Sequence, residues 1–228
     1  MFRMMNLDIA PAARPARTTL KGRHVNLVPL DPAKHAEDLW KAACPPQHDE
    51  LWRYLFDGPY HERLAFESAL AKKAASDDPL FLAILDQSGG RAVGYASYMR
   101  IEPTHRVIEI GSILYSPLLQ RTTGATEAMY LMARHAFDDL RYRRYEWKCD
   151  ARNAPSRAAA LRLGFTFEGI FRQHMIVKGQ NRDTAWFSML DSEWPARKAA
   201  FERWLDPSNF SNGAQKRSLS DFHTAIES

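Results

Sequence analysis

The 228-residue sequence predicts a mixed α/β (α+β) domain, in which a central, mostly antiparallel sheet of about seven strands carries helices on both faces. Three observations lead to this fold class. Apolar runs of strand length alternate with longer stretches of helical periodicity. The turn signals Gly89-Gly90 and Pro103-Thr104-His105 join three successive apolar runs as hairpins. Helical stretches separate the later strands, so crossover connections occur beside the hairpins.

The N-terminal half begins with an arm over residues 1–19 that is rich in Ala, Pro and Arg. This arm has no apolar periodicity, so we expect it to be extended or disordered, and it could wrap a neighbouring copy in a homodimer. Asp31 supplies the cap of the first helix and Pro32 its first turn, and Pro45-Pro46 ends it. The elements expected here are a strand at 24–30, helices at 31–43 and 61–75, and strands at 80–86, 92–101 and 107–115.

The C-terminal half opens with a predicted helix over 123–140, whose small and apolar side chains form one core-facing stripe. Asn153 opens a short helix that Gly164 ends, since glycine is the usual helix terminator. Strands are expected at 144–150, 165–171 and 184–190, with a loop between the last two, and a final helix at 195–204. Residues 205–228 are polar and predict a mobile tail, which leaves residues 20–204 as the folded domain.

Composition and charge argue against several classes of protein. The chain is 45% hydrophobic and 25% charged, as in ordinary globular proteins, and its net charge of +4 is low for a nucleic-acid binder. Its densest basic group suits a helix end and solvent better than a nucleic acid; the group is Arg134, Arg141, Arg143 and Arg144. Two cysteines are too few for a zinc cluster, so no metal is expected. No signal peptide and no apolar run of about 20 residues is present, which predicts a cytoplasmic protein without a membrane partner.

A polar turn at 120–126 lies between the strand at 107–115 and the helix that follows. It contains Gly124 and opens the helix, and the first amides of a helix have no partner within it. The helix dipole also favours an anion at this end. The turn is neither a Walker loop nor a dinucleotide fingerprint, because the further glycines and the Gly-Lys pair are missing. We interpret it as a pyrophosphate site.

Two motifs together resemble the GNAT superfamily of acyl-CoA-dependent N-acyltransferases. The first is Arg121-x-x-Gly124-x-Thr126, and the second is Asn153-x-x-Ser156 followed by Gly164-Phe165. The closest likeness is to the branch with the bacterial ribosomal-protein N-terminal acetyltransferases, and it covers residues 20–194. The family usually has Gly or Ala where this sequence has Thr126, which is still a small residue.

The resemblance implies a GNAT fold with a sheet that splays at the binding site of acetyl-CoA, the acyl donor. The strands ending at Tyr115 and starting at Arg144 would separate there. Backbone groups of Ile113, Leu114 and Tyr115 would pair with the pantetheine arm. Asn153 and Ser156 would face the thioester. Pyrophosphate contacts would come from the turn, namely Arg121 as a charge partner and the amides of Thr122, Thr123, Gly124, Ala125 and Thr126. As an alternative, Asn153 and Ser156 only cap their helix.

Catalysis would require a base for the attacking amine and a proton or hydrogen bond for the departing thiolate. Glu109 lies on an apolar strand, where a carboxylate is costly unless it is used, and the family often has a base on this strand. Alternatively Glu109 faces water or pairs with Arg100. Many relatives carry a tyrosine acid where this sequence has Ala160, so Ser156 could hydrogen-bond the sulfur instead.

The predicted function is transfer of an acetyl group from acetyl-CoA to a primary amine by direct attack. The acceptor could be a small-molecule amine or a protein N-terminus, and the donor could be another acyl-CoA such as succinyl-CoA. The alternative is a GNAT-fold module that binds acyl-CoA or a metabolite without turnover, which Ala160 favours. The aromatic segment 52–60 either walls the acceptor pocket or packs in the core, and His105 and His174 either border that pocket or serve packing and solvent.

Overall fold

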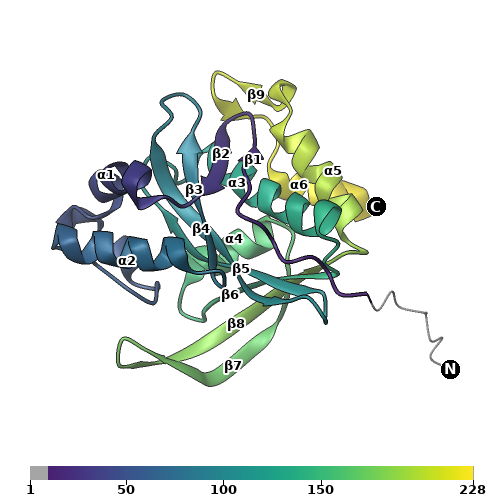
Figure 1. Ribbon diagram of the computed structural model, residues 1–228. Coiled ribbons are helices and arrows are strands. Elements are labelled where there is room, and N and C mark those ends of the chain that lie inside the picture. Colours follow the sequence, from purple (N-terminus) through teal and green to yellow (C-terminus); the bar gives the residue numbers. More distant parts are fainter. Residues whose placement is uncertain (1–9, 228) are drawn as a thin grey trace.

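The structure, a computed structural model, describes residues 10–227 (Figure 1). Its main sheet has eight strands in the order β1-β2-β3-β4-β5-β6-β8-β7, and of the described pairs only β5 with β6 is parallel. The predicted mixed, mostly antiparallel sheet is therefore confirmed, with one strand more than expected. The strands are β1 (Leu20–Lys21), β2 (Val25–Pro29), β3 (Leu80–Asp86), β4 (Ala92–Glu102), β5 (Val107–Tyr115), β6 (Arg144–Asp150), β7 (Thr166–Val177) and β8 (Gln180–Leu190).

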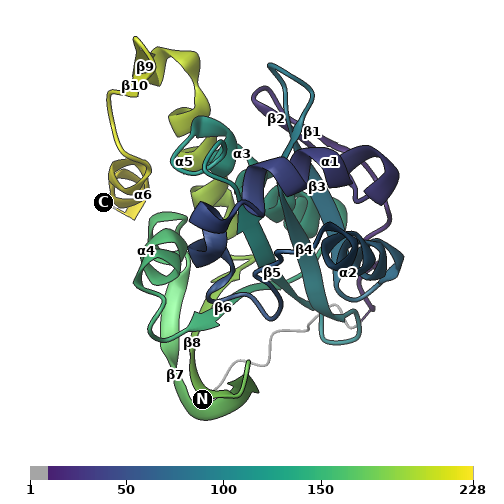
Figure 2. The same ribbon diagram turned by 90° about the vertical axis from the view of Figure 1, so that its left-hand side faces the viewer.

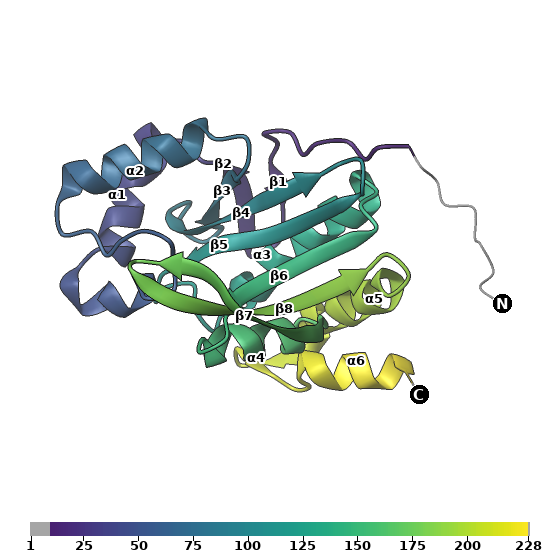
Figure 3. The same cartoon turned by 90° about the horizontal axis from the view of Figure 1, so that it is seen from below.

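Helices cover both faces of this sheet, as predicted (Figures 1 and 3). They are α1 (Pro32–Ala43), α2 (Arg63–Ala75), α3 (Thr123–Arg134), α4 (Ala154–Arg162), α5 (Trp194–Leu205) and α6 (Leu219–Glu227). Helix α3 continues into a π-helical turn, η2 (His135–Asp139). One core packs α3, α5 and α6 against the sheet, and a second packs α1 and α2 against β3 and β4. Strands β5 to β8 therefore keep much of one face free of helices (Figure 3).

The first helices begin and end where the sequence predicts. The Asp31 carboxylate accepts a hydrogen bond from the Ala33 amide (3.0 Å), which caps α1. The 3-10 helix η1 (Pro46–Trp52) follows, and the indole of Trp52 donates to the Ala43 carbonyl (2.8 Å). Gly58 has a φ of +68°, and a Cβ there would lie 2.4 Å from the Trp52 ring, so only glycine fits this turn. The segment after α1 is thereby folded back onto the second core.

The hairpin of β7 and β8 is longer than predicted. We expected strands at 165–171 and 184–190 with a loop between them, whereas pairing continues to Val177 and Gln180. Most side chains of the outer part of β7 are exposed, so the period-two pattern that marks a half-buried strand is absent there. A register shift between Phe171 and Met175 bends the hairpin.

The C-terminal residues are structured, contrary to the mobile tail that their polarity predicted. They form η3 (Pro207–Asn209), the short strands β9 (Phe210–Ser211) and β10 (Ala214–Gln215), and α6. Leu219 and Phe222 of α6 are buried in the main core, and these few apolar residues are enough to dock the helix. Figure 2 shows this segment along the outside of α5.

The described part of the predicted N-terminal arm, residues 10–19, is extended along its own domain. The Ala12 amide donates to the Pro103 carbonyl (3.0 Å), and Arg17 forms an ion pair with Asp77 (2.9 Å). These contacts account for an ordered path without regular secondary structure. Residues 1–9 of the predicted arm lie outside the described residues.

Candidate functional site

Strands β5 and β6 separate in the middle of the sheet. Their parallel pairing runs from Val107 and Arg144 to Ile110 and Trp147, yet both strands continue, to Tyr115 and Asp150. Among the described residues, the β6-facing edge of β5 therefore has no strand partner beyond Ile110. This opening is the splay that the resemblance implied, and it exposes backbone groups that a ligand can pair with.

A bulge in β5 lies beside this opening. The register with β4 shifts between the pairs Tyr95–Leu114 and Ser97–Gly111, so β5 carries one extra residue there. Ser112 has a φ of +48°, in the left-handed region that side chains rarely adopt. Gly111 and Ser112 thus lie in a bulge, which turns the end of β5 away from β6.

The predicted pyrophosphate turn leads directly into α3. The hydroxyl oxygen of Thr122 accepts a hydrogen bond from the Ala125 amide (3.1 Å), which makes Thr122 the N-cap. The amides of Thr123 and Gly124 come first in the helix, before its own hydrogen bonds begin. Arg121 is exposed, with a φ of +60°. The turn thus combines a helix N-terminus with an exposed cation, which suits an anion.

Gly124 and Thr126 have packing roles that the sequence did not predict. A Cβ on Gly124 would lie 2.8 Å from Cγ1 of Val25 in β2, so close packing against the sheet requires glycine whether or not a ligand binds. Thr126 is buried, and its hydroxyl accepts a hydrogen bond from Arg162 of α4 (3.1 Å). Arg162 is therefore a second cation beside this turn, and no motif indicated it.

Glu127 fixes the same turn to the rest of the sheet. Its buried carboxylate accepts hydrogen bonds from the amides of Arg23 (2.9 Å), His24 (2.6 Å) and Val25 (2.9 Å). Three amide donors satisfy a buried carboxylate without a basic partner. Sequence reasoning missed this residue, because its partners lie about a hundred positions away along the chain.

Asn153 and Ser156 open α4 beside the end of β6. The Asn153 side chain accepts from the Ser156 amide (3.1 Å), so the capping alternative is present. The Ser156 hydroxyl oxygen accepts from the indole of Trp147 (3.0 Å), the last β6 residue paired with β5. Ala160 stands at the position where the resemblance implies a tyrosine that acts as general acid, and it is fully buried. The Tyr115 hydroxyl donates to the Ala125 carbonyl (2.9 Å).

Glu109 lies within a chain of charges across the open face of the sheet. Its side chain is 3% exposed, and its carboxylate contacts Arg100 (2.7 Å) and Lys148 (2.9 Å). The pairing with Arg100 that the sequence left open is therefore present. Successive ion pairs, from Lys148 onward, then link Glu146, Arg144 and Glu168. The Glu109 side chain lies on the open face of the sheet, whereas the Trp147 ring lies on the opposite face, in the main core. The Glu109 carboxylate and the Ser156 hydroxyl, which bonds to Trp147, therefore lie on opposite sides of the opening.

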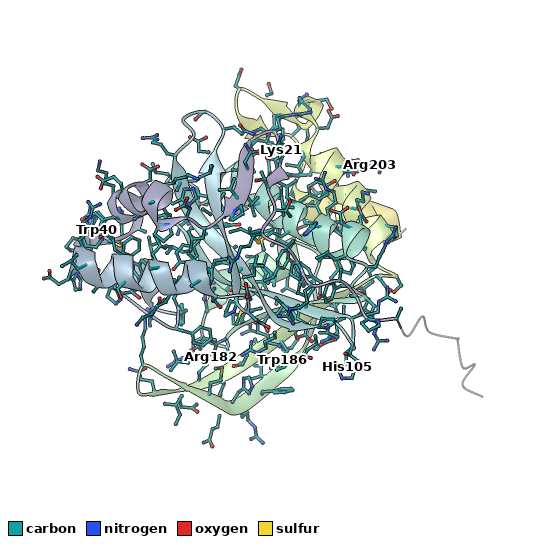
Figure 4. The ribbon with its side chains drawn as sticks, viewed as in Figure 1. Lys21, Trp40, His105, Arg182, Trp186 and Arg203 are labelled. Carbon is teal, nitrogen blue, oxygen red and sulfur yellow. The ribbon has the colours of Figure 1, made fainter. Side chains whose placement is uncertain are left out.

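Aromatic side chains border the charge chain on the hairpin side. The Lys148 ammonium lies 3.8 Å from the ring centroid of Trp186, whose ring packs against Phe171 at 4.5 Å. His174 contacts both rings and the Thr184 hydroxyl (3.0 Å). Burial, together with the nearby cations, lowers the pKa of His174, which keeps the ring neutral at pH 7. Trp186 lies on the side of the hairpin that faces the rest of the domain, and exposed His105 lies apart from it (Figure 4).

The aromatic segment 52–60 packs partly in the core, as one of its two interpretations predicted, and its place beside an acceptor pocket stays a prediction. Trp52 and Tyr60 pack edge to face in the second core (5.2 Å between centroids). Tyr54 and Phe56 point away from this core and contact residues that follow β6 or lie on β8. The Tyr54 hydroxyl donates to the Arg152 carbonyl (3.3 Å), and the guanidinium of Arg182 lies 5.2 Å from the centroid of the Phe56 ring. This segment therefore closes one end of the open sheet face.

Metal binding, a membrane span and the basic group of the sequence can also be compared with the structure. Within residues 10–227, no three His, Cys, Asp or Glu side chains are grouped to hold a metal ion. The helices of that range are all too short or too polar to cross a membrane. The basic group suggested by the sequence is divided, since Arg144 belongs to the charge chain while Arg134 lies over the Tyr130 ring at 5.6 Å.

Comparison with known proteins gives one consistent answer. A family model described as the acetyltransferase (GNAT) domain matches residues 24–166. A solved GCN5-related N-acetyltransferase from Brucella melitensis is 50% identical, with a TM-score of 0.93, and the match covers 95% of this chain and 99% of that one. A second structure, the microcin C7 self-immunity acetyltransferase MccE with acetyl-CoA and AMP, shares the fold at 20% identity and a TM-score of 0.63, over 74% of this chain and 93% of that one.

A curated relative lies in the branch suggested by the sequence. YdaF of Bacillus subtilis, named as a candidate ribosomal N-acetyltransferase, is 28% identical over 109 residues. The match covers 48% of this chain and 59% of that protein, so it spans little more than half of the relative's length.

Proposed function

This chain belongs to the GNAT acetyltransferase family, and from that premise we propose that it transfers an acetyl group from acetyl-CoA to a primary amine by direct attack on the thioester. One observation carries the proposal. Beyond Ile110 the edge of β5 is unpaired, and Tyr115 at the end of that strand is hydrogen-bonded to Ala125 in the first turn of α3 (2.9 Å), so an extended acyl-pantetheine arm and its pyrophosphate would have neighbouring places to bind.

On the donor side, the chain supplies backbone and hydroxyl groups. Residues Ile113 to Tyr115 would pair with the pantetheine arm, as a further strand does. The α3 amides and Arg121 would hold the pyrophosphate, with Arg162 close to the same turn. Asn153 and Ser156 would contact the thioester end, where the Ser156 hydroxyl oxygen accepts a hydrogen bond from Trp147.

On the acceptor side, the amine must be uncharged to attack. Glu109 is the carboxylate next to the opening and would take the amine proton through a water molecule. Arg100 and Lys148 hold it in one position, and the surrounding charges keep this face polar. Ser156, from the other side, would donate a hydrogen bond to the departing sulfur, in place of the missing tyrosine acid.

The acceptor class follows less directly. The name of YdaF and the open face of β5 to β8 support a protein N-terminus or another extended amine. Acetyl-CoA is the donor we favour, because the MccE structure of the same fold holds it, and succinyl-CoA serves as the alternative donor to test.

The testing experiment has two readouts. Acetyl-CoA at millimolar concentration should raise the melting temperature, and thiol release should follow on addition of an amine from a panel of peptides, polyamines and amino acids. No shift with any acyl-CoA would contradict the donor site. A shift without thiol release across the panel would support the second candidate instead.

That second candidate is an acyl-CoA-binding module without turnover. It is favoured by the buried Ala160 at the position of the expected general acid. It is also favoured by the ion pairs of Glu109 with Arg100 and Lys148, which already engage its carboxylate. Under this hypothesis, the wild-type protein and Glu109→Gln would bind acetyl-CoA equally well, and neither would release thiol when an amine is added.

A further inference from the structure

Arg182 on β8 is a buried cation without a polar partner. The residue is 6% exposed, and its Nε is fully buried with no hydrogen-bond partner. Across residues 10–227, no hydrogen bond or ion pair involves its guanidinium nitrogens. Burying an unpaired charge is costly, so proteins normally pair such a group. Burial accordingly lowers the pKa of Arg182, which still leaves this guanidinium protonated near neutral pH.

The carboxylates near Arg182 are committed to other cations. Asp150 accepts two hydrogen bonds from the Arg152 guanidinium (3.0 and 2.8 Å) and one from its amide. Glu109 is paired with Arg100 and Lys148. The charge chain contains three cations and three carboxylates; these are Arg100, Lys148, Arg144, Glu109, Glu146 and Glu168. Arg182 is therefore a buried positive charge on this face with which no carboxylate of the described residues forms an ion pair.

The position of Arg182 suits an acceptor and not the nucleotide end of a donor. It lies on the hairpin side of the open sheet face, as does Trp186 (Figure 4). The ring of Phe56 holds one side of the guanidinium at 5.2 Å, and the Lys178 ammonium anchors the hairpin to the Trp52 carbonyl (2.7 Å). The predicted pyrophosphate turn lies instead at the N-terminus of α3. A planar guanidinium held in this way is suited to bind a carboxylate with two parallel hydrogen bonds.

We propose that Arg182 binds a carboxylate of the acceptor, so that the preferred substrates are amines that carry a carboxylate near the amino group. This rests on the proposed acetyl transfer to an amine. The carboxylate would complete the charge balance of the face and would orient the amine toward the opening beside Glu109.

The binding experiment does not depend on turnover. Thermal shifts would be measured with acetyl-CoA present, for propionate, butyrate and glutarate against their uncharged amides. We expect the carboxylates to stabilise the protein and the amides to have little effect. Arg182→Gln should abolish the difference and Arg182→Lys should reduce it, whereas Arg152→Gln, which changes an exposed arginine already paired with Asp150, should keep it. Equal shifts for acids and amides in the wild-type protein would overturn the proposal.

The turnover experiment separates the two proposals. β-Alanine and γ-aminobutyrate would be compared with their amides by thiol release. We expect a KM about 10- to 100-fold lower for the acids than for the amides, and loss of that ratio in Arg182→Gln. Acetylation of acids and amides with equal KM would overturn the carboxylate site while leaving amine acetylation intact. Carboxylate binding that Arg182→Gln abolishes, without thiol release from any amine, would support the site and contradict the proposed function.

Discussion

The indole Nε1 of Trp147 donates a hydrogen bond to Oγ of Ser156 across 3.0 Å. Trp147 is also the last β6 residue paired with β5, so this bond fixes the first turn of α4 to the point where the two strands part. A hydroxyl that accepts from an indole becomes a better donor itself, because hydrogen bonds in a chain polarise one another. This polarisation supports the proposed role of Ser156 as a hydrogen-bond donor to the departing sulfur.

Ser156→Ala should lower kcat about 10- to 100-fold, as expected for one lost hydrogen bond to a developing thiolate. Acetyl-CoA affinity should change little, because most donor contacts would come from the α3 turn. The measurement is steady-state thiol release with calorimetric binding of acetyl-CoA. Ser188→Ala is the matched control, since that hydroxyl donates to Glu168 on the far strands. A Ser156→Ala enzyme as fast as the control would remove the hydroxyl from the mechanism.

Glu109→Gln should lower kcat about 100-fold or more, if the carboxylate is the base. Glu146→Gln is the matched control, because it removes the other carboxylate on Lys148. Both variants should lose about 1–3 kcal/mol of unfolding free energy through the buried lysine. Only the first should lose kcat, and equal kcat losses would mean that Glu109 acts through the charge network alone.

Local signals predicted the elements that local chemistry determines. Asp31 with Pro32, and Asn153 before its helix, are caps whose hydrogen bonds span two or three residues, and both are present. The splay of β5 from β6, in contrast, came from the family resemblance and not from any residue pattern.

Features that depend on distant contacts escaped prediction. Glu127 and Arg182 look like ordinary surface charges in the sequence, and only the fold shows one capping three amides and the other buried without a partner. Helix α6 was missed because two buried apolar residues, Leu219 and Phe222, give too weak a pattern. The sequence also could not separate the alternatives for Trp52 to Tyr60, because neighbouring residues there serve different purposes.

Asp150 should contribute stability that depends on pH. Burial alone would raise its pKa, but hydrogen bonds from Arg152 hold the pKa below the ordinary value. The ionised form is therefore favoured by folding, so its stabilisation is complete above about pH 4 and is lost as the pH falls through the lowered pKa. Asp150→Asn should melt earlier than wild type at pH 7, and the gap should narrow on titration toward pH 3. A gap that stays constant between pH 7 and pH 3 would contradict this assignment.

Gly124 can be tested for packing and for ligand approach separately. An alanine inside a helix normally stabilises it by about 0.5–1 kcal/mol relative to glycine. Here the added Cβ would meet Val25 Cγ1 at 2.8 Å, so Gly124→Ala should instead cost about 1–3 kcal/mol. Val25→Ala removes the obstructing methyl groups, so the double variant should lose less stability than the sum of the single changes, by about 0.5–3 kcal/mol. Urea unfolding of the four proteins measures this coupling, and additive losses would contradict the packing role.

Acetyl-CoA affinity of the same four proteins decides what else the glycine does. If packing is its whole purpose, the double variant should recover both stability and affinity. If the backbone must also approach the pyrophosphate, affinity should stay at least tenfold lower, while stability recovers, because the new methyl group still lies at the start of α3. We expect the second result, since the amides of Thr123 and Gly124 are the first of the helix and would face the proposed pyrophosphate.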